Sequence, residues 1–140
     1  MIKLITGRRG SGKTKVLIDA IHAAEKVSKG NVVAIQKGSS LNTDITHKVR
    51  LINIEDYNVE GYDAFYGFIA GILASDHDCT DIFVDATLRI IGRDYDKVGE
   101  MFEKLEKISA DTTITCTISA DNSELSDNIK KFVGKKKKNS

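Results

Sequence analysis

The glycine-rich turn at residues 7–14 (GRRGSGKT), near the start of the chain, is the feature that most constrains the fold. A short apolar run, residues 2–5, comes before the turn and is typical of a buried strand. Residues 13–28 follow with apolar side chains at helical spacing. Because glycine adopts backbone angles that a side chain forbids, the chain can turn sharply between these elements. We therefore expect a strand, a tight loop and a helix in succession.

The rest of the chain repeats this alternation of strand and helix. Apolar, β-branched runs predict four further strands, at residues 31–36, 49–54, 81–86 and 112–119. Helical spacing predicts three further helices, at residues 62–75, 95–108 and 123–133. Asp94 is expected to cap the second of these helices. The pattern predicts a three-layer α/β fold, in which helices cover both faces of a mostly parallel, five-stranded sheet.

Length and composition fit one globular domain. The chain has 140 residues, 41% hydrophobic and 29% charged, which is typical of a folded protein. We expect a single domain over residues 1–133 and a mobile, lysine-rich tail over residues 134–140. The longest apolar stretch, residues 65–74, is about half as long as a membrane span. Met1 leads directly into a strand, so no signal peptide is expected and the predicted location is the cytoplasm.

Charge is unevenly distributed along the chain. Residues 1–50 carry ten Lys or Arg against three Asp or Glu, whereas residues 51–129 carry five against seventeen. The basic first third contains the glycine turn and suits a polyanionic ligand. Residues 130–140 carry six lysines but no Arg, and Phe132 is the one aromatic side chain there. This composition favours a solvated tail over a surface that binds nucleic acid or an anionic membrane.

The cysteines and histidines form no metal-binding pattern. Cys79 is expected on a loop and Cys116 in a core strand, and neither has a Cys or His partner at ligand spacing. Both are expected to be reduced thiols.

The glycine turn has the spacing G-x-x-x-x-G-K-[ST] of a Walker A motif, or P-loop. In this motif, backbone N–H groups and the following helix N-terminus bind phosphate oxygens. Lys13 is expected to reach the β- and γ-phosphates, and the Thr14 hydroxyl to ligate Mg²⁺. ATP is the expected nucleotide on frequency alone, because no base-specific motif is present. The residues expected to bind it are Gly7, Arg8, Arg9, Gly10, Ser11, Gly12, Lys13, Thr14 and Lys15.

A second element of such a site is an acid at the end of an apolar strand. Asp85 follows the run Ile82-Phe83-Val84 and is expected to hold Mg²⁺ as a Walker B carboxylate, with a surface or capping role as the alternative. In many P-loop ATPases a glutamate follows this aspartate directly, but here the next residue is Ala86.

The order of these motifs resembles the RecA-like branch of the P-loop proteins, which includes thymidine kinases and corrinoid adenosyltransferases. In that branch the last strand usually lies between the two motif strands. Three segments resemble short bacterial P-loop proteins that are loosely labelled twitching-motility PilT-like ATP-binding proteins. These segments are MIKLITGRRGSGKT, EDYNVEGYDAFYGFIAGILA and FVDATLRIIGRD. The resemblance implies ATP binding.

Hydrolysis also requires a group that orients the attacking water. RecA-type ATPases place a glutamate at the end of the strand beside the Walker B strand. On that basis Glu55 is the first candidate and Asp56 the second, and an exposed acidic turn is the alternative. Ser119 is a candidate sensor of the γ-phosphate. Arg89 or Arg93 would act in trans in a homo-oligomer, or would simply lie on the surface.

Three functions are compatible with this sequence. The first is a slow, Mg²⁺-dependent ATPase or nucleotide switch, in which Lys13, Glu55 and Asp85 are the catalytic candidates. The second is a small-molecule kinase or transferase, and the third a non-hydrolysing nucleotide sensor or interaction module.

Overall fold

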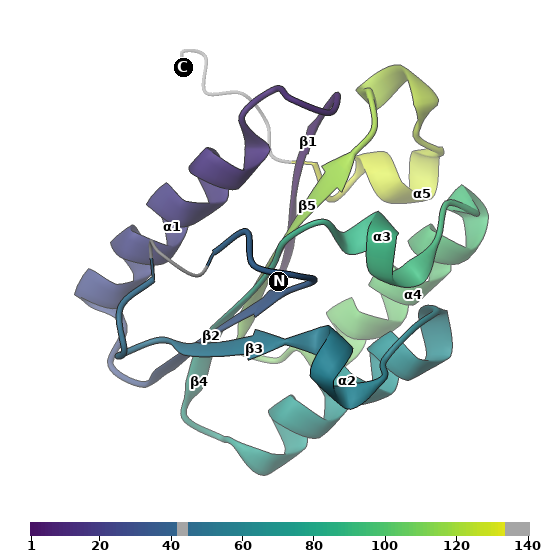
Figure 1. Cartoon of the computed structure of the whole chain (residues 1–140). Coiled ribbons are helices and arrows are strands. Elements are labelled where there is room, and N and C mark those ends of the chain that lie inside the picture. Colours follow the sequence, from purple (N-terminus) through teal and green to yellow (C-terminus); the bar gives the residue numbers. More distant parts are fainter. Residues whose placement is uncertain (42–44, 134–140) are drawn as a thin grey trace.

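The computed structural model describes residues 1–41 and 45–133, which form an α/β fold around a five-stranded parallel sheet (Figure 1). The strands are β1 (Ile2–Gly7), β2 (Asn31–Gln36), β3 (Arg50–Asn53), β4 (Cys79–Val84) and β5 (Thr113–Ser119). The α-helices are α1 (Lys13–Val27), α2 (Tyr62–Ser75), α3 (Thr87–Ile91), α4 (Tyr95–Ile108) and α5 (Asp127–Lys130). Two 3-10 turns, η1 (Ile54–Tyr57) and η2 (Asn122–Glu124), complete the described elements.

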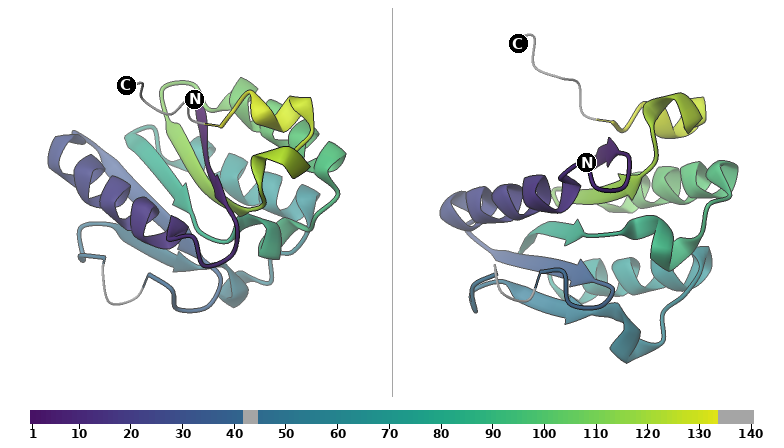
Figure 2. Two further views of the ribbon diagram at one scale, coloured as in Figure 1. Left: turned by 90° about the horizontal axis from the view of Figure 1, so that it is seen from above. Right: turned by 45° about the horizontal axis from the view of Figure 1, so that its top comes forward.

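Helices cover both faces of the sheet, as predicted. α1 lies on one face, and α2, α3, α4 and α5 lie on the other (Figure 2). On the first face, Leu17 and Ile21 of α1 pack with Val32 of β2 and Phe83 of β4. The second face is the larger core and includes Phe65 of α2, Phe102 of α4 and buried residues of β1, β2, β4 and β5, and Ile52 of β3 packs against it. A parallel sheet needs this cover because its strands are apolar on both sides.

The strand order is β1-β5-β4-β2-β3, and every neighbouring pair is parallel. β5 therefore lies between β1, which leads into the glycine turn, and β4, which leads into Asp85. This is the position that the resemblance implies for the last strand. Because all strands run in the same direction, the last residues of β1, β4 and β5 lie at the same end of the sheet. These residues are Gly7, Val84 and Ser119. The glycine turn and Asp85 follow two of these ends.

Three expectations about the fold are wrong, and one helix was not predicted. β3 does not lie beside β4, because β2 pairs with both of them and leaves β3 at the edge. The helix expected over residues 123–133 is divided into η2 and the single turn α5, with Leu125 in an extended conformation between them. α3 was not expected at all. Cys79 lies in β4 and is buried, not on a loop.

The tail at residues 134–140 and part of the loop after β2, residues 42–44, lie outside the described residues. Within the described part of the chain, no helix has the length and apolar character needed to cross a membrane.

Candidate functional site

The glycine turn between β1 and α1 adopts a conformation that depends on its glycines. Gly10 and Gly12 have φ angles of 81° and 91°, in the left-handed region that residues with a side chain rarely occupy. At Gly7, an added Cβ would collide with the Ser11 hydroxyl. Gly12 is also the N-cap of α1, and no side chain caps the helix there. The first N–H groups of α1 are therefore available to an anion.

The side chain of Lys13 folds back over this turn. Its Nζ donates a hydrogen bond to the carbonyl oxygen of Arg8 at 2.9 Å, and the residue is only 8% exposed. Burial lowers the pKa of the Lys13 ammonium group, and the nearby Asp85 carboxylate opposes that effect. A cation held in a poorly solvated position beside free N–H groups favours an anionic ligand.

Asp85 is the centre of a hydrogen-bond network that joins four segments. Its carboxylate, on a residue that is 4% exposed, accepts hydrogen bonds from three hydroxyl groups. Thr14 donates from α1 at 3.2 Å, Ser40 from the loop after β2 at 2.8 Å, and Thr117 from β5 at 2.7 Å. The Thr117 oxygen also accepts the backbone N–H of Ala86 at 2.7 Å. The network places Asp85 against Thr14 of the glycine turn.

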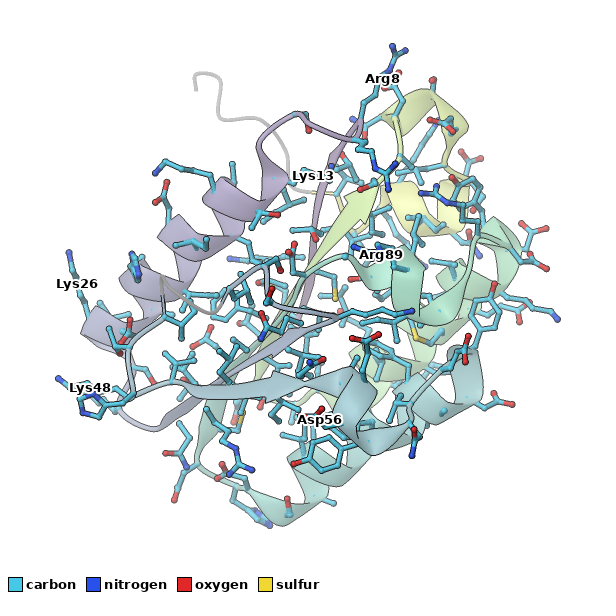
Figure 3. All side chains as sticks on the ribbon, viewed as in Figure 1. Arg8, Lys13, Lys26, Lys48, Asp56 and Arg89 are labelled. Carbon is cyan, nitrogen blue, oxygen red and sulfur yellow. The ribbon has the colours of Figure 1, made fainter. Side chains whose placement is uncertain are left out.

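These residues surround one open cavity of about 740 Å³. The glycine turn and α1 contribute Arg9, Gly10, Gly12, Lys13 and Thr14. The opposite side consists of residues that follow β2 and β4, together with the end of β5. Figure 3 shows Lys13 at the start of α1 and Arg89 on α3, whereas Asp56 lies apart from both, on η1 after β3. Within the described residues, Asp85 is the only carboxylate that lines the cavity.

Some of the predicted site residues lie outside the cavity. Arg8 is exposed and forms an ion pair with Asp121 at 3.1 Å, and this bond holds the pKa of Asp121 below its usual value. Lys15 is exposed on α1 and pairs with Asp19 at 3.2 Å. Glu55 belongs to η1 after the edge strand, so the proximity to β4 on which its nomination depended is absent. Ser119, in contrast, does line the cavity.

Sequence reasoning missed Ser40, Thr117 and Lys37, which also line the cavity. Thr117 carried a partial signal, since it lies near the carboxyl end of a predicted core strand yet is polar. Ser40 belongs to a polar loop in which several neighbours have similar side chains, so the sequence offers no reason to select it. Lys37 directly follows β2, and its Nζ donates to the Arg89 carbonyl oxygen at 2.9 Å.

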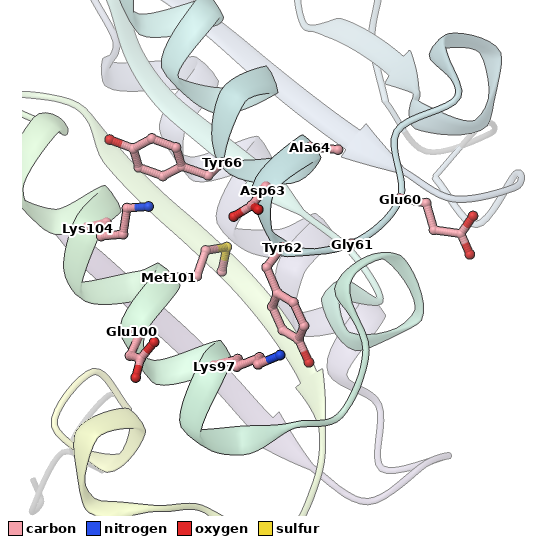
Figure 4. Close-up of a pocket in the computed structure, with 10 residues that line it drawn as sticks. All are labelled: Glu60, Gly61, Tyr62, Asp63, Ala64, Tyr66, Lys97, Glu100, Met101 and Lys104. Atoms are coloured by element: carbon pink, nitrogen blue, oxygen red, sulfur yellow. The ribbon is translucent and has the colours of Figure 1, made fainter.

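A second cavity, of about 590 Å³, lies between the start of α2 and one side of α4 (Figure 4). Its charged side chains are mixed: Glu60, Asp63 and Glu100 line it together with Lys97 and Lys104. Lys104 also lies over the ring of Tyr66, with its Nζ 4.5 Å from the ring centroid. With three acids and two lysines, this set has no excess of positive charge to select an anion, so the cavity at the glycine turn is the better candidate.

No protein-family model matches the chain, and no curated protein sequence matches it either. The case for a function therefore rests on the residues of the cavity.

Proposed function

We propose that this protein binds a nucleoside triphosphate with Mg²⁺ and acts as a slow ATPase or a nucleotide-controlled switch of the RecA-like P-loop type. ATP is the expected nucleotide on frequency. The proposed location is the cytoplasm, where ATP is present and free thiols such as Cys79 and Cys116 stay reduced.

The observation that carries the proposal is the contact between the Thr14 hydroxyl and the buried Asp85 carboxylate, 3.2 Å apart beside Lys13. The glycine turn supplies the hydroxyl and the end of β4 supplies the carboxylate. Binding of a Mg²⁺-nucleotide requires a tight turn with open N–H groups, a lysine, and a pair of oxygen ligands such as those of Thr14 and Asp85.

The donor set also fits Mg²⁺ in particular. Thr14 and Asp85 offer a hydroxyl and a carboxylate oxygen, and Mg²⁺ prefers such hard oxygen ligands. In phosphate-binding sites it is typically held by one or two protein ligands together with the phosphates and water. When bound, Mg²⁺ would neutralise phosphate charge, while Lys13 and the N–H groups of the turn hold the phosphates in place.

Slow hydrolysis follows from what surrounds Asp85. Ala86 occupies the position after it, and Glu55 lies outside the cavity beyond β3. Asp85 itself already accepts three hydroxyl hydrogen bonds. This arrangement also favours the alternative of a nucleotide sensor that does not hydrolyse its ligand.

Calorimetric titration with Mg²⁺-ATP tests the proposal. We expect Lys13→Ala to weaken binding about tenfold or more, because it removes a charge-assisted contact to phosphate. Lys26→Ala is the matched control, since Lys26 is exposed in the last turn of α1 and does not line the cavity. Its affinity should equal that of the wild type. Absence of both ATP and GTP binding in the wild type would refute the proposal.

Phosphate release separates the two candidate functions. Slow release that is lost in Lys13→Ala supports the ATPase, and binding without release supports the sensor. Glu55→Gln should leave any release unchanged because the residue lies outside the cavity.

A further inference from the structure

The side of the cavity that faces the glycine turn is also basic. Lys37 follows β2, Arg89 lies on α3, and Arg93 follows α3, and all three line the cavity that Lys13 lines. Figure 3 shows Arg89 on α3. The ion pairs found among residues 1–41 and 45–133 involve other cations, so none of these three forms an ion pair with a described carboxylate.

Two of these cations are held in place by neutral groups. Lys37 Nζ donates to the carbonyl oxygen of Arg89 at 2.9 Å. Arg93 Nη1 donates to the carbonyl oxygen of Ser119 at 3.1 Å and to the Tyr95 hydroxyl at 3.4 Å. These contacts orient the side chains without cancelling their charge. Positioned, uncompensated cations attract anions most strongly where they converge in a concave site.

Charge balance indicates more anion than one Mg²⁺-nucleotide supplies. The cavity is lined by five cationic side chains, those of Arg9, Lys13, Lys37, Arg89 and Arg93, and by one carboxylate. A nucleoside triphosphate with its Mg²⁺ carries a net charge of only about −2. Roughly two positive charges therefore remain, which is about the charge of one further phosphoryl group.

We infer that Lys37, Arg89 and Arg93 form a second anion subsite that takes a phosphoryl group across the cavity from the glycine turn. The inference rests on the proposed function, because it takes the anion at the glycine turn to be the phosphates of the nucleotide. The charge balance favours a phosphate on a second substrate, because the terminal phosphate of the nucleotide is already counted in the nucleotide's charge. The terminal phosphate is the other source of the same chemistry, and the experiments below distinguish the two. In both cases the arginines act within the same chain, and no neighbouring subunit has to supply them.

The first experiment compares ATP with ADP. Affinities for both, with Mg²⁺, are measured for the wild type, Arg89→Ala and Arg50→Ala. Arg50 is a matched control because it is an exposed arginine at the amino end of β3. The cavity lies at the carboxyl ends of the strands, on the far side of the sheet from Arg50. If the subsite holds the terminal phosphate, Arg89→Ala weakens ATP about tenfold and leaves ADP unchanged. Arg50→Ala changes neither.

The second experiment uses inorganic phosphate as the probe. Its binding to protein saturated with Mg²⁺-ADP, or with a non-hydrolysable ATP analogue, is followed by ³¹P NMR. Phosphate that binds the ADP form but not the analogue form identifies the terminal-phosphate position. Phosphate that binds both forms identifies a second substrate and favours the kinase or transferase function. In each case Arg89→Ala should abolish the binding.

Two results would overturn the subsite. One is an equal loss of ATP and ADP affinity in Arg89→Ala, since the residue would then serve the main phosphate site. The other is unchanged binding of both nucleotides and of phosphate. If the wild type binds no nucleotide, the proposed function fails, and the subsite is tested separately in Lys13→Ala, which lacks the glycine-turn lysine. Phosphate binding to that variant, lost on adding Arg89→Ala, supports the subsite, and no binding overturns it.

Discussion

The hydroxyl of Thr117 holds together both the backbone and the carboxylate of the candidate site. It donates to Asp85 Oδ1 at 2.7 Å and accepts the N–H of Ala86 at 2.7 Å. Ala86 has a φ of 57°, a left-handed conformation that is unfavourable for alanine. Thr117→Val keeps the shape of the side chain, which is 1% exposed, but removes both hydrogen bonds.

The cost of this substitution follows from the two lost bonds. A hydrogen bond to a charged group contributes about 1.5–3 kcal/mol, and a neutral bond about 0.5–1.5 kcal/mol. We therefore expect the free energy of unfolding to fall by about 2–4 kcal/mol. For a domain of this size, 1 kcal/mol shifts Tm by about 3–4 °C, so Tm should fall by roughly 6–16 °C.

Denaturant unfolding followed by circular dichroism measures this difference. Thr115→Val is the matched control, because Thr115 lies two residues earlier on β5 and is also buried. Its hydroxyl is not among the three that donate to Asp85, so its replacement should cost less than about 1 kcal/mol. Equal destabilisation by the two substitutions would refute the structural role assigned to Thr117.

Three other predictions concern the ionisable groups. ATP affinity should fall as pH rises through the pKa of Lys13 in the free protein, because burial sets that pKa below 10.5 and phosphate binds the protonated form. This pH dependence should be absent in Lys13→Ala, and its persistence there would contradict the assignment. Asp85→Asn should abolish the enhancement of ATP affinity by Mg²⁺, measured with and without chelator, because an amide is a poorer Mg²⁺ ligand than a carboxylate. An undiminished Mg²⁺ effect would place the metal elsewhere. Burial raises the pKa of Cys79 to about 11 and that of Cys116 to about 12, so at pH 8 a disulfide reagent should label neither thiol until the protein is unfolded. Rapid labelling of the folded protein would contradict their burial.

Several elements could be predicted from the sequence because their signals are local. β2 coincides with the predicted residues 31–36, where an unbroken apolar run suits a strand covered on both faces. α4 begins as predicted after Asp94, whose carboxylate accepts the N–H of Lys97. The glycine turn was also predictable, since its spacing specifies both the loop and its neighbours.

The position of β3 could not be predicted, because strand order depends on contacts between distant segments. The alternation in residues 49–54 marks a strand but does not identify its partner. This uncertainty is why Glu55 was expected near β4 and lies instead beyond the edge strand. α3 was missed because five residues are too few to show a helical period, and because it starts from the left-handed Ala86.

The candidate site was predictable in its motif residues and not in their partners. Lys13, Thr14 and Asp85 line the cavity, as expected for residues of one site. Ser40 and Thr117 reach the same carboxylate only because the ends of β2 and β5 flank the end of β4. Hydroxyl side chains are common in this sequence, and only the folded sheet distinguishes these two from the others.

The most direct test of nucleotide binding at the glycine turn is a ¹H–¹⁵N NMR titration of the protein with Mg²⁺-ATP. We predict that the largest shifts occur at the backbone amides of residues 8–15, with smaller shifts at Ser40, Ala86 and Thr117. These shifts should be absent in Lys13→Ala. Shifts confined to the cavity between α2 and α4, or no shifts at all, would contradict nucleotide binding at this site.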